Sequence, residues 1–245
     1  MEGKVENLSK DNKKILIITG GLGGEETEVR HLINIFNTIY PDATIDVVFL
    51  YSSKNKDWFL SRNNINFVEL GLKRSLNFFA KVFNLARSIL ELTKLKIKHD
   101  YDVVLSNADP SNLINLTSEL IADLFTLKVK NRVIIIRFNG FLSNISLHQT
   151  KIYEPIYKIL YYITYKSIYR YKNPIATSIS NAIKNDIENH GFEKGKIKVI
   201  YNPINIEEIQ ELKKEDLKPY EYVFKNPVLI TAGRLTKQKG QWYLI

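Results

Sequence analysis

The chain has 245 residues, 44% of them hydrophobic, which is enough to bury one large core or two smaller ones. It contains no cysteine, and this excludes disulfides, zinc–thiolate sites and a thiol nucleophile. The net charge of +9 favours anionic partners such as nucleotide phosphates, nucleic acid or acidic lipid headgroups, but a general abundance of lysine explains it equally well.

Residues 1–13 are polar and mixed in charge, and we interpret them as a tail. They show no apolar core of a secretory signal. The longest apolar runs of the chain fall far short of the roughly 20 residues that a membrane-crossing helix needs. We therefore expect a cytoplasmic protein, with association at the inner face of the membrane as a further option.

Short β-branched runs alternate with longer amphipathic stretches over residues 14–203, which is typical of βαβ units. The first run, KILIIT at residues 14–19, is almost continuously apolar, as expected for a strand that is buried on both faces. The pattern predicts an α/β fold in which helices cover both faces of a parallel sheet. The further predicted strands are, in chain order, 44–51, 66–69, 103–106, 132–138, 175–178 and 196–201.

The first predicted strand is followed by a glycine-rich turn that contains Gly20, Gly21, Gly23 and Gly24. Without side chains, its backbone amides can approach a ligand closely, and the start of the next helix favours an anion. Ligands of open parallel sheets bind outside the carboxyl ends of the strands, which is where this turn is predicted to lie. The spacing differs from that of a dinucleotide-binding loop, and a simple flexible turn is the alternative interpretation.

The helix predicted after the strand 175–178 has recognisable ends. Ser180 is its predicted N-cap, and Gly191 is the predicted left-handed stop after His190.

We place a domain boundary near Pro203. Residues 14–203 are predicted to form one Rossmann-like domain, and residues 204–226 a polar linker. Residues 227–245 contain one more predicted strand, at 228–232, and the start of a helix that has no C-terminal cap. A lone strand and turn cannot bury their apolar surface, so we expect only the start of a second Rossmann-like domain.

Arg234 and Lys239 flank the loop that follows the predicted strand 228–232. A guanidinium and an ammonium group at this position can converge on a diphosphate. On spacing alone, a solvated basic turn explains the loop equally well.

Two segments carry a resemblance to a known family. NPVLITAGRLTKQKGQWYLI, at residues 226–245, resembles the opening of the C-terminal domain of glycosyltransferase family 4, which comprises retaining enzymes with the GT-B fold. SISNAIKNDIENHGFEKGKIKVIYNPINIEEI, at residues 178–209, is similar to the end of that family's N-terminal domain. The glycine-rich turn also resembles the family's glycine loop, but residues 25–27 depart from the commoner small residues. The resemblance is specific over about residues 178–245.

The resemblance implies transfer of a hexosyl or other glycosyl group from a nucleotide-diphosphate donor to an acceptor hydroxyl, in cell-surface polysaccharide or glycolipid synthesis. It implies that Arg234 and Lys239 bind the donor pyrophosphate, and that the glycine turn lies near the donor phosphates or the acceptor. The family's paired glutamates, separated by seven residues, have no counterpart here, so the catalytic residues are unknown.

We therefore expect this chain alone to be inactive or nearly so. The alternative is a truncated or split-gene half that works only by binding. It would bind either an acceptor or a second chain, and that second chain would supply the missing domain.

Arg137 and Asn139 follow at the end of the predicted strand 132–138. This stretch resembles the family segment that places a polar residue, often histidine, beside the acceptor. Asparagine is a poor general base, so Asn139 would orient the acceptor and would not move a proton. A polar strand end without a function is the alternative.

The histidines show no paired metal-ligand spacing, and the aspartates around the strand 103–106 define no metal geometry. We predict no metal and no cofactor apart from the nucleotide-sugar substrate. No nucleic-acid-binding module is recognisable. Two basic, aromatic helical stretches, 72–98 and 153–171, can contact an anionic membrane that holds a lipid-linked acceptor. Packing of their apolar faces on the sheet is the simpler interpretation.

Overall fold

A computed structural model describes residues 12–21, 24–53, 55–72, 78–142, 154–233, 235 and 239–244. The chain separates into two compact units between Pro203 and Ile204. Each unit is described by itself.

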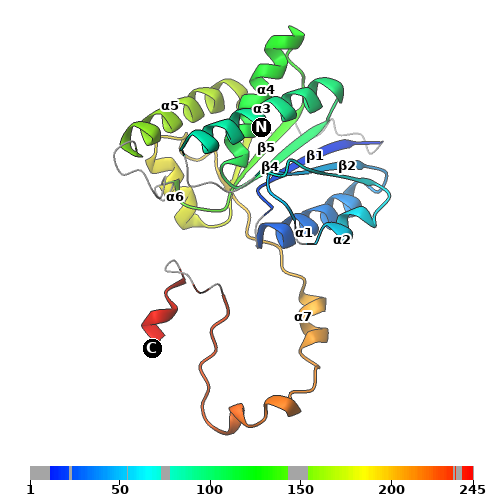
Figure 1. The fold of residues 1–245 in the computed structure, drawn as a ribbon, viewed down its shortest axis with the longest axis vertical. Helices are drawn as coiled ribbons and strands as arrows, with labels where there is room; N and C mark the ends of the chain where they lie inside the picture. The colour runs from blue at the N-terminus through cyan, green and yellow to red at the C-terminus, as the bar shows by residue number, and fades with distance from the viewer. Residues whose placement is uncertain are drawn as a thin grey trace. The chain divides into compact units, whose positions relative to one another are not determined.

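Within the described residues, the first unit contains one sheet of seven parallel strands (Figure 1). Its strand order is β3-β2-β1-β4-β5-β6-β7, so β1 and β4 are central neighbours. The strands are β1 (Lys14–Thr19), β2 (Thr44–Phe49), β3 (Ile65–Glu69), β4 (Val103–Asn107), β5 (Val133–Phe138), β6 (Ile175–Ser178) and β7 (Lys198–Val199).

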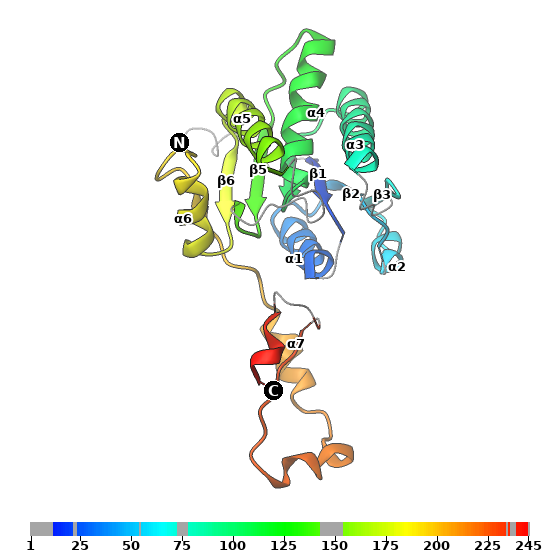
Figure 2. The same cartoon turned by 60° about the vertical axis from the view of Figure 1, so that its left-hand side comes forward.

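Helices cover both faces of this sheet (Figure 2). One face carries α1 (Gly24–Ile39) and the short α2 (Lys56–Leu60). The opposite face carries α3 (Phe78–Lys98), α4 (Ser111–Thr126) and α5 (Glu154–Lys172). A further helix, α6 (Asn181–Asn189), connects β6 to β7.

Alternate residues of β1 explain the two layers, because successive strand side chains point to opposite faces of a sheet. Ile15 and Ile17 pack in a cluster with α1 and α2, whereas Leu16 and Ile18 pack in a cluster with α3 and α4. All four are fully buried. A third cluster, around Phe138, joins β5 and β6 to α4, α5 and α6.

The predicted α/β fold class is therefore confirmed, and several elements match closely. The strands predicted at 14–19 and 175–178 have the predicted bounds. The Ser180 hydroxyl caps α6 by accepting a hydrogen bond from the Ile183 amide at 3.2 Å, and Gly191 has a φ of +82°. The strand predicted at 196–201 was too long, since only Lys198–Val199 pairs with β6.

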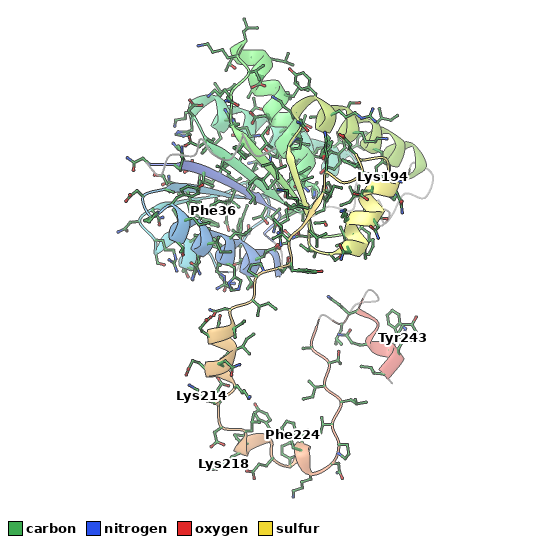
Figure 3. All side chains as sticks on the ribbon, turned by 180° about the vertical axis from the view of Figure 1, so that it is seen from behind. Phe36, Lys194, Lys214, Lys218, Phe224 and Tyr243 are labelled. Carbon is green, nitrogen blue, oxygen red and sulfur yellow. The ribbon has the colours of Figure 1, made fainter. Side chains whose placement is uncertain are left out.

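The second unit contains α7 (Ile206–Leu212) and short 3₁₀ turns. None of its described residues is buried. Figure 3 shows their side chains as sticks on the ribbon, with Phe224 and Tyr243 among those labelled. The strand predicted at 228–232 was wrong: these residues form no strand and pair with no other. A strand needs a neighbour for its backbone amides and carbonyls, and the described part of this unit offers none.

Candidate functional site

The carboxyl ends of parallel strands meet at one edge of a sheet, and polar side chains gather at this edge. Asn107 ends β4, Arg137 is the penultimate residue of β5, and Asn139 is the first residue after β5. Asn202 follows β7, and α1 begins at the same edge with Glu28 in its second turn. We call these five residues the Glu28 cluster.

The Glu28 carboxylate is the centre of the cluster. Its Oε1 accepts a hydrogen bond from Nε of Arg137 at 2.5 Å. Its Oε2 accepts from Nδ2 of Asn139 at 2.7 Å and from Nδ2 of Asn107 at 3.1 Å. The side chains of Glu28 and Arg137 are 5% and 4% exposed, so this is a buried ion pair whose lone pairs are occupied by amides.

The outer part of the cluster has one unused acceptor. The Arg137 guanidinium donates to Oδ1 of Asn202 at 2.7 Å, and Nδ2 of Asn139 donates to Oδ1 of Asn107 at 3.0 Å. Oδ1 of Asn139 is buried and accepts no hydrogen bond. Asn139 is only half-buried and the next residue, Gly140, is exposed. A buried amide oxygen without a donor is costly, and a ligand hydroxyl would satisfy it.

The backbone behind the cluster is held in place by α4. The Arg137 carbonyl accepts hydrogen bonds from Nδ2 of Asn112 and from the Ala108 amide, both at 2.9 Å. Burial and the nearby Asp109 carboxylate raise the pKa of the Tyr165 phenol. This phenol therefore stays protonated, and the two groups that donate to the Arg137 carbonyl are neutral amides.

The start of α1 is unusually acidic for a phosphate-binding turn. Glu25, Glu26 and Glu28 all lie in its first two turns, where carboxylates complement the helix dipole. Glu26 is buried and accepts from the Ser53 hydroxyl at 2.9 Å, while Glu25 accepts from the Thr19 hydroxyl at 3.2 Å. Carboxylates at this position oppose a phosphate and favour ligands that donate hydrogen bonds, such as sugar hydroxyls.

Packing explains one glycine of the turn. Gly21 has a φ of +78°, and a Cβ there would lie 2.7 Å from Cδ2 of Phe49. A Cβ on Gly20 would lie 2.8 Å from Oε2 of Glu25, the end of a flexible side chain that can move away, and Gly24 has open space around it. Gly23 lies outside the described residues. Contact of this turn with a ligand stays a prediction.

The two predicted phosphate-binding cations belong to the second unit. Lys239 is exposed, and Arg234 lies outside the described residues. Their role towards a diphosphate is untested.

Sequence patterns indicated Arg137 and Asn139 but missed Glu28, Asn107 and Asn202. Asn107 could have been found as a polar end of the strand next to β5. Glu28 had a weaker signal, a third glutamate just after the glycine-rich turn.

In the described part of the chain, no group of three or more potential metal ligands comes together, and no helix is long and apolar enough to cross a bilayer. The expectation of a metal-independent protein stays a prediction.

No protein-family model matches the sequence. Over 54 residues the chain is 48% identical to an uncharacterized glycosyltransferase of Methanocaldococcus jannaschii, a segment that makes up 21% of this chain and 13% of that protein.

Three solved structures have a similar fold. A glycosyltransferase from Rickettsia africae matches with a TM-score of 0.58 and 17% identity over 96% of this chain and 56% of its own. The lipopolysaccharide outer core galactosyltransferase WaaB matches with a TM-score of 0.53 and 21% identity over 79% and 46%. The UDP-GlcNAc 2-epimerase of Neisseria meningitidis, bound to UDP-GlcNAc, matches with a TM-score of 0.52 and 15% identity over 87% and 54%.

These likenesses show a glycosyltransferase-like GT-B fold. The chain spans about half the length of the solved structures.

Proposed function

We propose that this chain is the acceptor-binding half of a glycosyltransferase that moves a sugar from a nucleotide-diphosphate donor to an acceptor hydroxyl with retention. The observation that carries the proposal is the Glu28 cluster at the carboxyl edge of the sheet, with the unpaired Oδ1 of Asn139. A sugar acceptor offers several hydroxyls, each of which donates and accepts hydrogen bonds. The asparagines of the cluster carry both amide N–H donors and amide oxygen acceptors.

Asn139 has the orienting role in this proposal. Its Nδ2 group is held by Glu28 and Asn107, so its Oδ1 is fixed in direction. An acceptor hydroxyl that donates a hydrogen bond to that oxygen would be held in one orientation. Such pre-orientation of a nucleophile is a large part of catalysis in group transfer. The amide itself would not take the proton.

The acidic start of α1 supports an acceptor-side role for the glycine turn. Glu25 and Glu26 disfavour a diphosphate nearby, whereas the charge of Glu28 is balanced by Arg137. Of the two roles expected for the turn, we therefore propose contact with the acceptor. The donor phosphates are then left to Arg234 and Lys239, which can neutralise the charge that develops on the departing diphosphate.

The family assignment also belongs to this proposal. Solved epimerases and transferases share the fold, so the fold alone does not separate the two reactions. The 48% identity over 54 residues with a glycosyltransferase favours transfer. We propose membership of glycosyltransferase family 4, a nucleotide-sugar donor, and a sugar or lipid-linked acceptor in cell-surface polysaccharide or glycolipid synthesis.

The acceptor site can be tested directly on the chain by saturation-transfer NMR with the methyl glycosides of glucose, galactose, mannose and N-acetylglucosamine. We expect saturation transfer to at least one glycoside, and its loss in Asn139→Ala. The matched control is Asn185→Ala, an exposed asparagine on α6. Equal transfer to both variants would contradict the acceptor site.

The donor site is tested on the protein that includes any sequence encoded after codon 245. In that protein, Arg234→Ala and Lys239→Ala should each weaken UDP-sugar binding by about tenfold or more, because charge-assisted hydrogen bonds to phosphate are lost. Lys225→Ala, in the same unit, is the control. Unchanged binding in both variants would remove the donor role.

A second candidate function is a half that binds an acceptor or a partner chain but has no activity of its own. The observation in its favour is that none of the described residues of 204–245 is buried, so they form no enclosed donor pocket. Turnover of UDP-GlcNAc or another nucleotide sugar by the 245-residue chain alone would refute this candidate.

A further inference from the structure

A cavity lies between the carboxyl-terminal part of α5 and the segment that follows α6. Its volume is about 160 Å³, which is enough for several water molecules. The side chains and backbone that line it belong to Lys166, Tyr169, Arg170, Gly191, Phe192 and Glu193. Because α5 leads into β6 and the segment after α6 leads into β7, the cavity lies towards the amino ends of these strands. The Glu28 cluster lies at the opposite, carboxyl edge.

The inner wall of the cavity is aromatic and holds one donor without a partner. Tyr169 and Phe192 are 4% and 3% exposed, and their rings meet edge to face with centroids 5.0 Å apart. The Tyr169 hydroxyl donates to no group within the described part of the chain. Burial and the charge of Glu193 raise the pKa of this phenol, so it stays a donor at neutral pH. A ligand acceptor would satisfy it.

Two cations face the cavity from the same side of α5, because Lys166 and Arg170 are four positions apart. Lys172, two positions further on, points the other way and pairs with Asp123 of α4. Lys166 is half-buried and Arg170 is exposed. Among the described residues, neither of these two cations has an ion pair or a hydrogen bond.

Gly191 makes room for the Lys166 ammonium group. It has a φ of +82°, and a Cβ on it would lie 2.5 Å from Nζ of Lys166. The backbone amides of His190, Gly191 and Phe192 already donate to carbonyls in the last turn of α6. Lys166 donates to none of the described carbonyls, so capping of α6 does not explain its position.

The carboxylate in the lining is already paired. Glu193 lies 2.8 Å from Nζ of Lys196, and Glu188 nearby accepts from the Gly195 amide at 2.9 Å. Lys194 adds an exposed cation to the same loop (Figure 3). The surroundings of the cavity therefore carry an excess of positive charge, which favours an anion.

We propose that this cavity binds the phosphate group of a small phosphate monoester. Its three terminal oxygens would accept from the Lys166 ammonium, the Arg170 guanidinium and the Tyr169 hydroxyl. A phosphate monoester carries about two negative charges at neutral pH, which matches the two unpaired cations. A carboxylate offers one charge and two oxygens and would leave a donor unused. The cavity shares no residue with the Glu28 cluster, so the proposal is independent of sugar transfer.

The test is an NMR titration of the full chain with methyl phosphate at constant ionic strength. His190–Gly191 is the only His–Gly pair in the sequence, so ¹³C-carbonyl histidine combined with ¹⁵N-glycine identifies the Gly191 amide signal. We expect a saturable shift of this signal. Acetate, a carboxylate of similar size, should bind at least about tenfold more weakly, because one charge-assisted hydrogen bond is missing.

Variants of the three donors test the assignment. Lys166→Gln and Arg170→Gln should each weaken methyl phosphate binding at least about tenfold, and Tyr169→Phe about fivefold. The matched controls are Arg87→Gln and Lys94→Gln, at exposed positions of α3, and they should leave the affinity unchanged. Circular dichroism checks that each variant is folded.

The absence of a saturable shift at Gly191 would overturn the proposal, as would equal affinities for acetate and methyl phosphate. Equal binding by the wild type, Lys166→Gln and Arg170→Gln would also overturn it. Asn139–Gly140 is the only Asn–Gly pair in the sequence, so the Gly140 signal can be assigned in the same way. A shift of the Gly140 signal with none at Gly191 would overturn the proposal in favour of a phosphate site beside the Glu28 cluster.

Discussion

Nε of Arg137 and Oε1 of Glu28 lie 2.5 Å apart in the core edge of the first unit, although the residues are 109 positions apart in the chain. Burial of two charges costs desolvation free energy, which their attraction offsets only when the remaining polar atoms are also paired. Asn107, Asn139 and Asn202 complete that pairing. The pair therefore fixes the end of β5 against α1, where the proposed acceptor binds.

Glu28→Ala should lower the free energy of unfolding by about 3–5 kcal/mol, because the Arg137 cation is then buried without its partner. Glu28→Gln should cost less, since an amide oxygen can still accept from Arg137. The measurement is urea denaturation followed by circular dichroism. The control is Glu193→Gln, which breaks the largely exposed pair with Lys196 and should cost less than about 1 kcal/mol. A Glu28→Ala protein as stable as this control would show that the buried pair does not matter for stability.

Gly21→Ala should destabilise the chain by about 2 kcal/mol or more. A left-handed alanine costs about 1–2 kcal/mol, and its Cβ would also press on the buried Phe49 ring. Gly24→Ala, which meets no atom within 4 Å, should change stability by less than about 0.5 kcal/mol. Thermal unfolding of both variants tests this difference. Similar stabilities would mean that the turn adapts and that its glycines are retained for another reason.

Lys96 should make stability rise with pH above neutrality. Burial lowers the pKa of its amine from 10.5 to about 8, although contact with Glu119 opposes that shift. Between pH 8 and 10.5 the folded chain has released a proton that the unfolded chain keeps, so the free energy of unfolding increases with pH. Relative to Lys96→Met, the wild type should gain up to about 3 kcal/mol across this window.

Glu119 keeps Arg132 as a partner in Lys96→Met, so that variant is expected to fold. Urea denaturation of wild type and variant at several pH values gives the comparison. Lys94→Met, on the exposed side of the same helix, is the matched control. A difference between wild type and Lys96→Met that does not change with pH would contradict the prediction.

Ser180→Ala should destabilise the chain by about 1 kcal/mol, because the Ile183 amide loses its only side-chain acceptor in the described structure. Ser180→Asp should restore most of the loss, since aspartate caps equally well and its charge suits the start of α6. Thermal melting curves provide the measurement. If aspartate fails to recover stability, the hydroxyl has a role other than capping.

The sequence predicted those elements whose signal is local. The continuous apolar run 14–19 predicted a doubly buried strand, and Ser180 and Gly191 predicted both ends of α6. The segment 228–232 carries the same local signal but forms no strand, because pairing depends on a neighbouring strand and not on β-branched composition. Similarly, only Lys198 and Val199 of the predicted strand 196–201 are in register with β6, and the Ile200 amide adds one hydrogen bond to the Ser178 carbonyl.

The candidate site was predicted only in part for the same reason. Arg137 and Asn139 could be identified because they end an obvious strand. Glu28 gave little signal, since helical periodicity alone does not say that a glutamate faces the sheet. Asn202 lies 65 positions from its partner Arg137, and no spacing rule connects the two.

The amino-acid sequence by itself determined the α/β class, the course of the strands in the first unit and the glycine-rich turn, because periodicity and backbone conformation are properties of neighbouring residues. The tertiary structure alone decided which polar side chains meet at the carboxyl edge, and which side chains of α5 line a cavity with the segment after α6. Both depend on strand order and helix packing, and these bring together residues from distant parts of the chain.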